Sequence, residues 1–271
     1  MQWREQMMDK TRALFLSHGG GPLPLLGDPG HTAMVENLEG LAGRVRVPDA
    51  LVVVSAHWEA SVPTITSGAN PGLIYDYHGF PPESYTIEYP CPGEPALAAE
   101  VHRRLQEAGI DAHLDPARGF DHGLFVPLKI MYPEAQVPCV QLSLVETLDP
   151  AQHIEIGRAL AGLHESGVWV VGSGFSFHNL RAFFTPDTQE SRQLNQSFEV
   201  WLGAVCCGRA DAEDARAAKL VHWDGAPGAR FCHPRAEHLL PLHVCYGVAG
   251  GPAAERIGMQ IMGKEASCYR W

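Results

Sequence analysis

Four histidines of this sequence lie where strand-like apolar runs end or where a helix begins. They occur in short segments marked by glycine, serine or proline, namely His18 in FLSHGGGP, His57 in VVVSAHWE, His178 in VVGSGFSFHNL and His238 in FCHPRAEHLLPL. In open α/β sheets, ligands bind in the crevice at the carboxyl ends of the strands. Three imidazoles brought there from distant parts of the chain would supply a metal site with open coordination positions.

The glycines that follow His18 leave more than one interpretation open. A glycine-rich turn can bind phosphate, but SHGGGP lacks the GxGxxG spacing and the lysine with serine or threonine of a P-loop. Glycine also lets a metal and a substrate approach the backbone closely. His57 ends the strongest β-like run, where the alternative to a functional group is a buried, hydrogen-bonded histidine.

His178 and His122 are further candidates in predicted loops. Ser173 and Ser176 near His178 would suit a serine hydrolase, but GSGFS does not match the GxSxG pattern of a nucleophilic serine. We expect His122, in GFDHGLFVP, to lie in a loop, where the alternative is an incidental turn histidine. The neighbouring Asp121 is a fair N-cap for the residues that follow, and we assign it no chemical role.

Glu237 and His238 are adjacent, and we expect both at the start of a helix. Neighbours on a helix point about 100° apart, so only one of them can face a metal squarely. Glu237 is then either solvated or in contact with a ligand from outside the metal's own shell. The competing His233 precedes a proline, which holds it extended, and we expect it not to be a ligand.

Short strand-like runs alternate with helical patterns, which predicts a single α/β domain. We expect strands over residues 13–17, 50–56, 110–114, 137–144, 168–172 and 256–262, and helices over 32–43, 95–108, 150–165, 187–206 and 238–248. We predict a mostly parallel central sheet flanked by helices, with the active site at the strand carboxyl ends. The expected catalytic domain spans residues 12–265, after an N-terminal extension of residues 1–11.

The stretch from residue 67 to 95 is long, irregular and too aromatic for a disordered linker. We expect it to fold over the mouth of the site, with Tyr77 and His78 binding substrate. The alternative is a satellite hydrophobic cluster under a long loop. The aromatic and imidazole side chains concerned are Tyr75, Tyr77, His78, Phe80 and Tyr85.

Composition narrows the class of protein. The 271 residues carry a formal net charge of −11 and no long basic run, so nucleic acid and anionic membranes are poor partners. Seven cysteines without a CxxC motif favour reduced thiols in a cytoplasmic protein over a disulfide framework. The N-terminus is charged and lacks the apolar core of a signal peptide, and no stretch reaches the ~20 apolar residues of a membrane span.

Six segments together resemble the class III extradiol ring-cleavage dioxygenases, most closely the 4,5-DOPA dioxygenase branch. They are SHGGGP, SAHWE, YDYHGFPPESYTIEYPCPG, RGFDHGLFVPLKIMYP, GSGFSFHNL and HPRAEHLLPL, in the family's order from His18 to Gly247. The resemblance implies one α/β domain, a non-haem metal, a catechol substrate and O2.

The resemblance also implies residue roles. His18 and His57 match the first two metal ligands, and His238 occupies the position of the third. His178 is similar to the acid–base histidine, and His122 resembles a second histidine that contacts substrate or bound oxygen. Protocatechuate-type members use a glutamate as third ligand, so the three-histidine set departs from the 2-His-1-carboxylate pattern of Fe(II) oxygenases and is also a zinc geometry. We expect Fe(II) for turnover, with Zn(II) as an alternative occupant.

The sequence is therefore interpreted as a non-haem extradiol dioxygenase that opens a small catechol, such as DOPA or a related catecholic acid, to a muconic semialdehyde. Two alternatives stay open at this point: a zinc-dependent hydrolase, in which the metal activates water, and a non-catalytic metal-bound scaffold for a protein partner. The cleavage position and the oligomeric state do not follow from the sequence.

Overall fold

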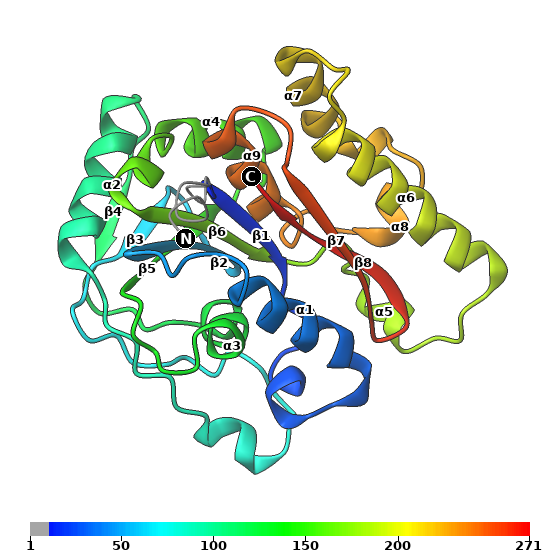
Figure 1. Ribbon diagram of the computed structural model, residues 1–271, viewed down its shortest axis with the longest axis horizontal. Coiled ribbons are helices and arrows are strands. Elements are labelled where there is room, and N and C mark those ends of the chain that lie inside the picture. Colours follow the sequence, from blue (N-terminus) through cyan, green and yellow to red (C-terminus); the bar gives the residue numbers. More distant parts are fainter. Residues whose placement is uncertain (1–10) are drawn as a thin grey trace, which may run out of the picture.

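The computed structural model describes residues 11–271, so the expected N-terminal extension lies outside the described residues except for Thr11. An eight-stranded sheet runs through the molecule in the order β4-β3-β5-β2-β6-β1-β8-β7 (Figure 1). Its strands are β1 (Ala13–Ser17), β2 (Ala50–Ala60), β3 (Thr64–Thr66), β4 (His113–Asp115), β5 (Cys139–Val145), β6 (Val168–Gly174), β7 (Glu255–Ile261) and β8 (Lys264–Arg270).

The four central strands, β5, β2, β6 and β1, are parallel to one another. Antiparallel pairing occurs only toward the edges, between β3 and β5, between β1 and β8, and between β7 and β8. The mostly parallel α/β fold predicted from the sequence is confirmed. Because the central strands run the same way, their carboxyl ends meet at one edge of the sheet, where a ligand crevice is expected.

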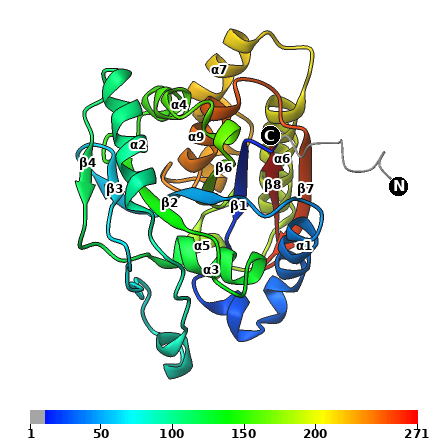
Figure 2. The ribbon, with the colours of Figure 1, turned by 60° about the vertical axis from the view of Figure 1, so that its left-hand side comes forward.

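Helices cover both faces of the sheet. Helices α2, α4 and α9 pack on one face, while α1 and α3 pack on the other, and α6 covers the β7–β8 hairpin (Figures 1 and 2). The helices are α1 (Thr32–Ala42), α2 (Pro95–Glu107), α3 (His122–Met131), α4 (Pro150–Ala159), α5 (Leu180–Phe183), α6 (Gln189–Cys207), α7 (Glu213–Val221), α8 (Ala229–Cys232) and α9 (Leu240–Ala249).

Burial explains why the central strands read as nearly continuous apolar runs. Every residue of β1, β5 and β6 is buried, as is β2 from residue 50 to 56. A parallel sheet covered on both faces has no solvent side, so apolar residues need not alternate with polar ones. The few polar side chains in these strands therefore require hydrogen-bond partners inside the protein.

Several predicted boundaries differ from the structure. Strand β2 continues to Ala60, and its register against β5 shifts between Val54 and Glu59. The expected helix over 150–165 ends at Ala159, and Gly162 then turns the chain with a φ of +87°. Asp149 caps this helix, its side chain accepting from the Ala151 N–H.

The sequence analysis missed strand β8, which pairs with β7 in a hairpin. Met262 and Gly263 form its two-residue turn, with φ of +51° and +77°. Positive φ at both central positions is typical of the type I′ turn that matches strand twist. Short strand β3 and helix α7 were also missed.

The expectation of a loop around His122 was wrong, because His122 is the first residue of helix α3. The helix is buried along most of its length, so its sequence shows no polar face and no helical periodicity. Pro127 within it further hid the helix from pattern reasoning.

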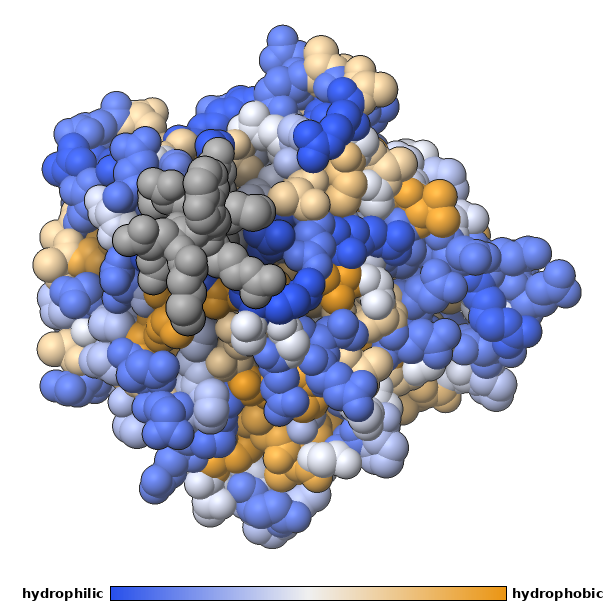
Figure 3. All heavy atoms as spheres, in the orientation of Figure 1, coloured by the Kyte–Doolittle hydropathy of each residue, from blue (hydrophilic) through white to orange (hydrophobic). Residues whose placement is uncertain are grey.

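The surface toward the viewer of Figure 1 mixes hydrophilic and apolar residues, with apolar side chains gathered in small groups (Figure 3). Among residues 11–271, no helix combines the length and apolarity needed to cross a bilayer. The seven cysteines are free thiols, six of them buried.

Candidate metal centre

Five imidazole rings converge at the carboxyl edge of the central strands. His18 directly follows β1, His57 lies in the irregular last part of β2, His178 is four residues beyond β6, and His122 begins α3. His238 lies in the turn two residues before α9, and not on the helix as predicted. Ring centroids are 4.9 Å apart for His18 and His57, 3.9 Å for His57 and His122, and 3.3 Å for His178 and His238.

The three predicted ligands each place a nitrogen in one small space. Ring nitrogens of His18, His57 and His238 all lie within 4.8 Å of one another, and the Nε2 atoms of His18 and His57 are 3.0 Å apart. Burial, followed by the mutual repulsion of the rings, holds the pKa of His18 and of His238 well below the usual value. Burial has the same effect on the pKa of His57, to which the charge of His122 adds. Neutral imidazoles are the form that binds metals.

His18 is oriented by a relay that starts in α3. Pro127 has no N–H, so the Gly123 carbonyl lacks its usual helical donor four residues on. The Ser173 hydroxyl, from β6, donates to that carbonyl. Its oxygen is then free to accept from Nδ1 of His18, 3.0 Å away. This arrangement fixes the proton on Nδ1 and leaves the Nε2 lone pair facing the other rings.

His122 is oriented by Asp76, a residue that the sequence analysis did not single out. Asp76 Oδ1 lies 2.8 Å from His122 Nδ1 and accepts the His122 backbone N–H at 3.0 Å. Burial raises the pKa of Asp76, but the His122 hydrogen bonds outweigh it and lower the pKa to about 2. The ionised carboxylate can only accept hydrogen bonds, so this geometry favours a proton on His122 Nδ1.

One carboxylate oxygen of Glu237 lies within hydrogen-bond distance of two histidine rings. Its Oε1 lies 3.1 Å from Nδ1 of His178 and 3.0 Å from Nδ1 of His238. Burial raises the Glu237 pKa, but the hydrogen bond from His178, a backbone hydrogen bond and the charges of His178 and Arg235 together outweigh it, so the pKa is lowered. Arg235 Nη1 stands 3.5 Å from the other oxygen, Oε2. Because both residues lie in a turn, Glu237 and His238 can face the same space, which the helical argument excluded.

Close backbone packing brings the His238 turn onto the sheet. A Cβ on Gly174, the last residue of β6, would lie 2.2 Å from the His238 carbonyl oxygen. Phe175, the next residue, donates its backbone N–H to the same oxygen at 2.9 Å. Only glycine fits at 174, which gives the second glycine of GSGFS a structural reason.

Two other polar residues near the cluster have structural partners. His233 is fully buried, and its Nε2 lies 2.7 Å from the Ser176 carbonyl oxygen. Asp121 occupies the N-cap position of α3, but its side chain makes no capping bond within the described residues. It accepts from the Ser55 hydroxyl at 2.7 Å and from Arg118 at 3.2 Å.

The irregular segment from residue 67 to 94 contacts the cluster through two adjacent residues, Asp76 and Tyr77, which both lie beside His122. Apart from its short 3₁₀ turn, η3 (Pro82–Thr86), it has no helix of its own, and it lies at the same end of the molecule as α3 (Figures 1 and 2). The Tyr77 ring is buried, 5.6 Å from the His122 ring, and its hydroxyl donates to the Ser84 carbonyl at 2.5 Å. His78 is exposed.

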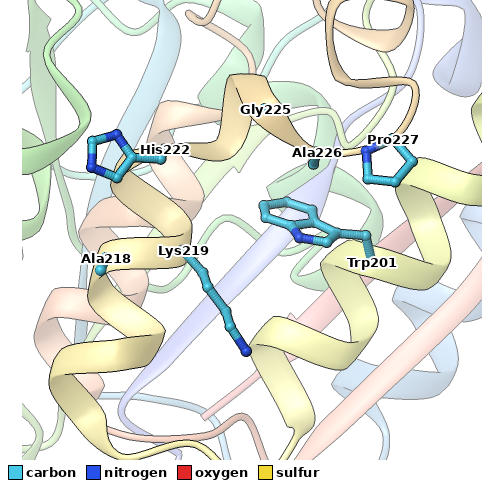
Figure 4. A pocket seen from close by; sticks show the side chains of 7 residues that line it. All are labelled: Trp201, Ala218, Lys219, His222, Gly225, Ala226 and Pro227. Atoms are coloured by element: carbon cyan, nitrogen blue, oxygen red, sulfur yellow. The ribbon is translucent and has the colours of Figure 1, made fainter.

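A separate open hollow of about 400 Å³ lies between α6 and α7 (Figure 4). Trp201, Lys219 and His222 are among its lining residues, and none of the five clustered histidines lines it. Lys219 is paired with Asp211 at 2.7 Å. The hollow is therefore distinct from the histidine cluster.

The donor set fits a divalent transition metal. Two buried imidazoles and the half-buried His57, all of lowered pKa, approach one another, and their Nδ1 atoms face Ser173, Glu237 and Asp76. Metal-binding histidines usually donate their second N–H to such a carboxylate or hydroxyl. The Nδ1 atoms of His122 and His178 also lie within hydrogen-bond distance of carboxylates, which leaves their Nε2 atoms without a partner among these contacts.

Known proteins share this sequence and fold. Residues 14–266 match the family described as the catalytic LigB subunit of aromatic ring-opening dioxygenase. The dioxygenase tasH of Hapsidospora irregularis is 42% identical over 260 residues, covering 89% of this chain and 79% of the relative. A 4,5-DOPA dioxygenase extradiol from Escherichia coli K12 is 37% identical over 251 residues, covering 92% and 89%.

A solved structure agrees. The crystal structure of the uncharacterized protein JW3007 from Escherichia coli K12 superposes with a TM-score of 0.76 at 31% identity, covering 96% of this chain and 99% of the other. The resemblance noted in the six sequence motifs is confirmed. The chain belongs to the LigB family of aromatic ring-opening dioxygenases and is a metal-dependent extradiol ring-cleavage dioxygenase that acts on a small molecule with O2.

Proposed function

We propose that His18, His57 and His238 bind one Fe(II) ion through their Nε2 atoms, with Zn(II) as an alternative occupant. The observation that carries this proposal is the arrangement of the rings: each Nδ1 faces an oxygen atom, ring nitrogens of the three histidines lie within 4.8 Å of one another, and the Nε2 atoms of His18 and His57 are 3.0 Å apart. Bound there, Fe(II) would supply the open coordination positions at which a catechol and O2 meet.

We propose that the reaction is O2-dependent ring opening of a small catechol to a muconic semialdehyde. In this reaction both atoms of O2 enter the product, so no further reductant is needed. The 4,5-DOPA dioxygenases among the relatives support DOPA or a related catecholic acid as the substrate class. Tyr77 and His78 are proposed to line the substrate side of the pocket.

His178 is proposed as the general base. Its Nδ1 proton is held by Glu237, so Nε2 carries the lone pair and can take a proton from a catechol hydroxyl. Glu237 stabilises the resulting imidazolium and keeps the ring in place. The same proton can later be returned to the opening ring, as acid–base catalysis requires.

His122 is proposed to contact the oxygen side of the reaction. Asp76 holds its Nδ1 proton, so Nε2 first accepts a hydrogen bond. Once Nε2 has taken up a proton, the ring becomes a donor toward an anionic oxygen, with Asp76 balancing the charge. The proposal therefore gives the two non-ligand histidines related chemistry on different sides of the cluster.

The test is anaerobic loading with Fe(II), followed by a panel of catechols and air. We expect O2 uptake on an oxygen electrode together with a yellow semialdehyde product. Ester or amide hydrolysis with Zn(II) and without O2 uptake would contradict the proposal and favour the hydrolase. Family membership already supports the oxygenase over both alternatives. The free cysteines support a cytoplasmic location, which cell fractionation would test.

A further inference from the structure

Asp76 connects the irregular segment to the start of α3. The residue belongs to no helix or strand, and His122, its partner, is 46 positions away in the chain. One oxygen, Oδ1, receives both the backbone N–H and the ring Nδ1 of His122. The side chain is only 21% exposed, so water competes weakly for these bonds.

Helix α3 needs this remote carboxylate. The first N–H groups of a helix have no partner within it and are usually capped by the residue just before. Here that residue is Asp121, whose carboxylate is turned toward Ser55, Arg118 and Gln141. Asp76 fills the vacant role, so the same atom fixes where the helix begins and how the His122 ring is turned.

The second oxygen of Asp76 faces a proposed metal ligand. Oδ2 lies 3.7 Å from Nδ1 of His57, while the opposite ring nitrogen, Nε2, approaches His18. Asp76 therefore stands on the Nδ1 side of two imidazoles, one a proposed ligand and one not.

We propose that Asp76 is a positioning residue that holds His122 in the Nδ1-protonated form with Nε2 toward the metal ligands. The inference rests on the proposed function of the histidine cluster. Because Asp76 lies in the segment from residue 67 to 94, the site is complete only when this segment is seated. The segment is then part of the site's architecture as well as a cover over it.

The direct test is the tautomer of His122, read from ¹⁵N imidazole resonances of the diamagnetic Zn(II)-loaded protein. The His122 signals are assigned by their loss in His122→Ala. We expect a proton on Nδ1 in the unmodified protein, a shift toward Nε2 protonation in Asp76→Ala, and retention of the Nδ1 proton in Asp76→Asn, whose amide oxygen still accepts. An unchanged His122 tautomer in Asp76→Ala would overturn the proposal.

Kinetics provide the second test, as a double-mutant cycle in the Fe(II) enzyme. We expect Asp76→Ala to lower kcat ~10–100-fold. In the His122→Ala background the same change should have almost no further effect, because Asp76 acts through His122. Effects that multiply fully would overturn the proposal. Asp76→Asn should retain more activity than Asp76→Ala.

A matched control and a separate readout protect the interpretation. Glu83, in the first turn of η3, is an exposed acid of the same segment, and Glu83→Gln should leave both tautomer and kcat unchanged. Metal content is measured for every variant. If no variant, including the unmodified protein, opens a catechol ring, the proposed function fails, while the tautomer of His122 still decides the role of Asp76.

Discussion

Two carboxylates each face the Nδ1 atoms of two histidines in this site, but they come from different kinds of chain segment. Glu237 precedes its ligand partner His238 directly in the chain, within a turn that packs tightly on β6. Asp76 comes from an irregular segment and reaches α3 across 46 positions. Each faces Nδ1 of one proposed ligand and of one proposed acid–base histidine.

The two carboxylates therefore have different expected roles: Glu237 supports a proposed metal ligand, and Asp76 supports mainly His122. Glu237 contacts both of its rings at hydrogen-bond distance, whereas Asp76 contacts His122 closely and His57 only at 3.7 Å. Removing Glu237 should therefore disturb metal binding and base chemistry together. Removing Asp76 should act mainly on His122.

The largest expected effect is on the ligand beside Glu237. His238→Ala should abolish metal retention after desalting, because a three-nitrogen set is reduced to two. Glu237→Ala should retain most of the metal with an affinity weakened ~10-fold, since only the partner of the ligand is lost. Elemental analysis after loading with Fe(II) or Zn(II) measures both. The reverse pattern would make Glu237 the ligand and break the comparison between the two carboxylates.

The next effect separates the two acid–base histidines. His178→Ala should keep the metal and lower turnover ~10²–10⁴-fold through loss of acid–base catalysis. His122→Ala should also keep the metal but cost less activity. Steady-state O2 uptake with parallel metal analysis tests both variants. Loss of metal in His178→Ala would make His178 a fourth ligand, leaving no room for a chelating catechol.

The segment that carries Asp76 offers a milder test. His78 is exposed, so His78→Ala should leave the melting temperature unchanged. If the segment shields the reaction, KM for catechol rises and O2 consumption exceeds semialdehyde formation. One-to-one coupling with unchanged KM would mean that the segment is only packing. His113→Ala, another exposed histidine, is the control for substitution itself.

Site residues marked by local sequence patterns could be predicted, whereas residues placed by long-range contacts could not. The pattern of apolar runs and glycines located His18, His57 and His178 because local signals mark the ends of parallel strands, whereas His238 was found from the expected start of a helix. Sequence reasoning did not place Glu237 correctly, because it assumed a helix where the chain forms a turn.

Asp76 and Ser173 were not assigned their positioning roles for a different reason. Their importance lies in contacts with residues far along the chain, and no local periodicity encodes such contacts. Two signals were nevertheless present. HGLFVPLKIM is ten residues long and apolar except for His122 and Lys129, which is typical of a mostly buried helix. An acid between aromatic residues in a long segment, as in YDYHGF, indicates a partly buried polar group that needs a partner.

The third proposed ligand, His18, is held by the neutral hydroxyl of Ser173 and by neither carboxylate. Removing this partner should therefore weaken metal binding less than removing a ligand does. Ser173→Ala removes the acceptor of the His18 Nδ1 proton and should weaken metal affinity ~10-fold. Pro127→Ala should act in the same direction but more weakly, because the new N–H competes with Ser173 for the Gly123 carbonyl. Metal titration against a competing chelator measures both. Equal affinity in all three proteins would show that the relay does not orient His18.

The last prediction concerns a histidine outside the cluster that has no carboxylate within hydrogen-bond distance. His153 is buried, its Nδ1 faces the Asp149 carbonyl at 2.7 Å, and its Nε2 accepts the Val145 N–H at 3.2 Å. Burial outweighs the Asp149 hydrogen bond and lowers the His153 pKa from 6.5 to about 4. Between these values the unfolded chain binds the proton first, so stability falls as pH falls, by at most ~1.4 kcal/mol per pH unit.

Above pH 6.5 both states are neutral at His153, and the residue adds no pH dependence. His153→Gln should therefore flatten the loss of stability between pH 6.5 and pH 4, measured by urea unfolding with saturating metal. His113→Gln, at an exposed position, should not change the slope. An unchanged slope in His153→Gln would mean that acid sensitivity comes from other groups, such as the buried His233 and His243, whose pKa values burial also lowers.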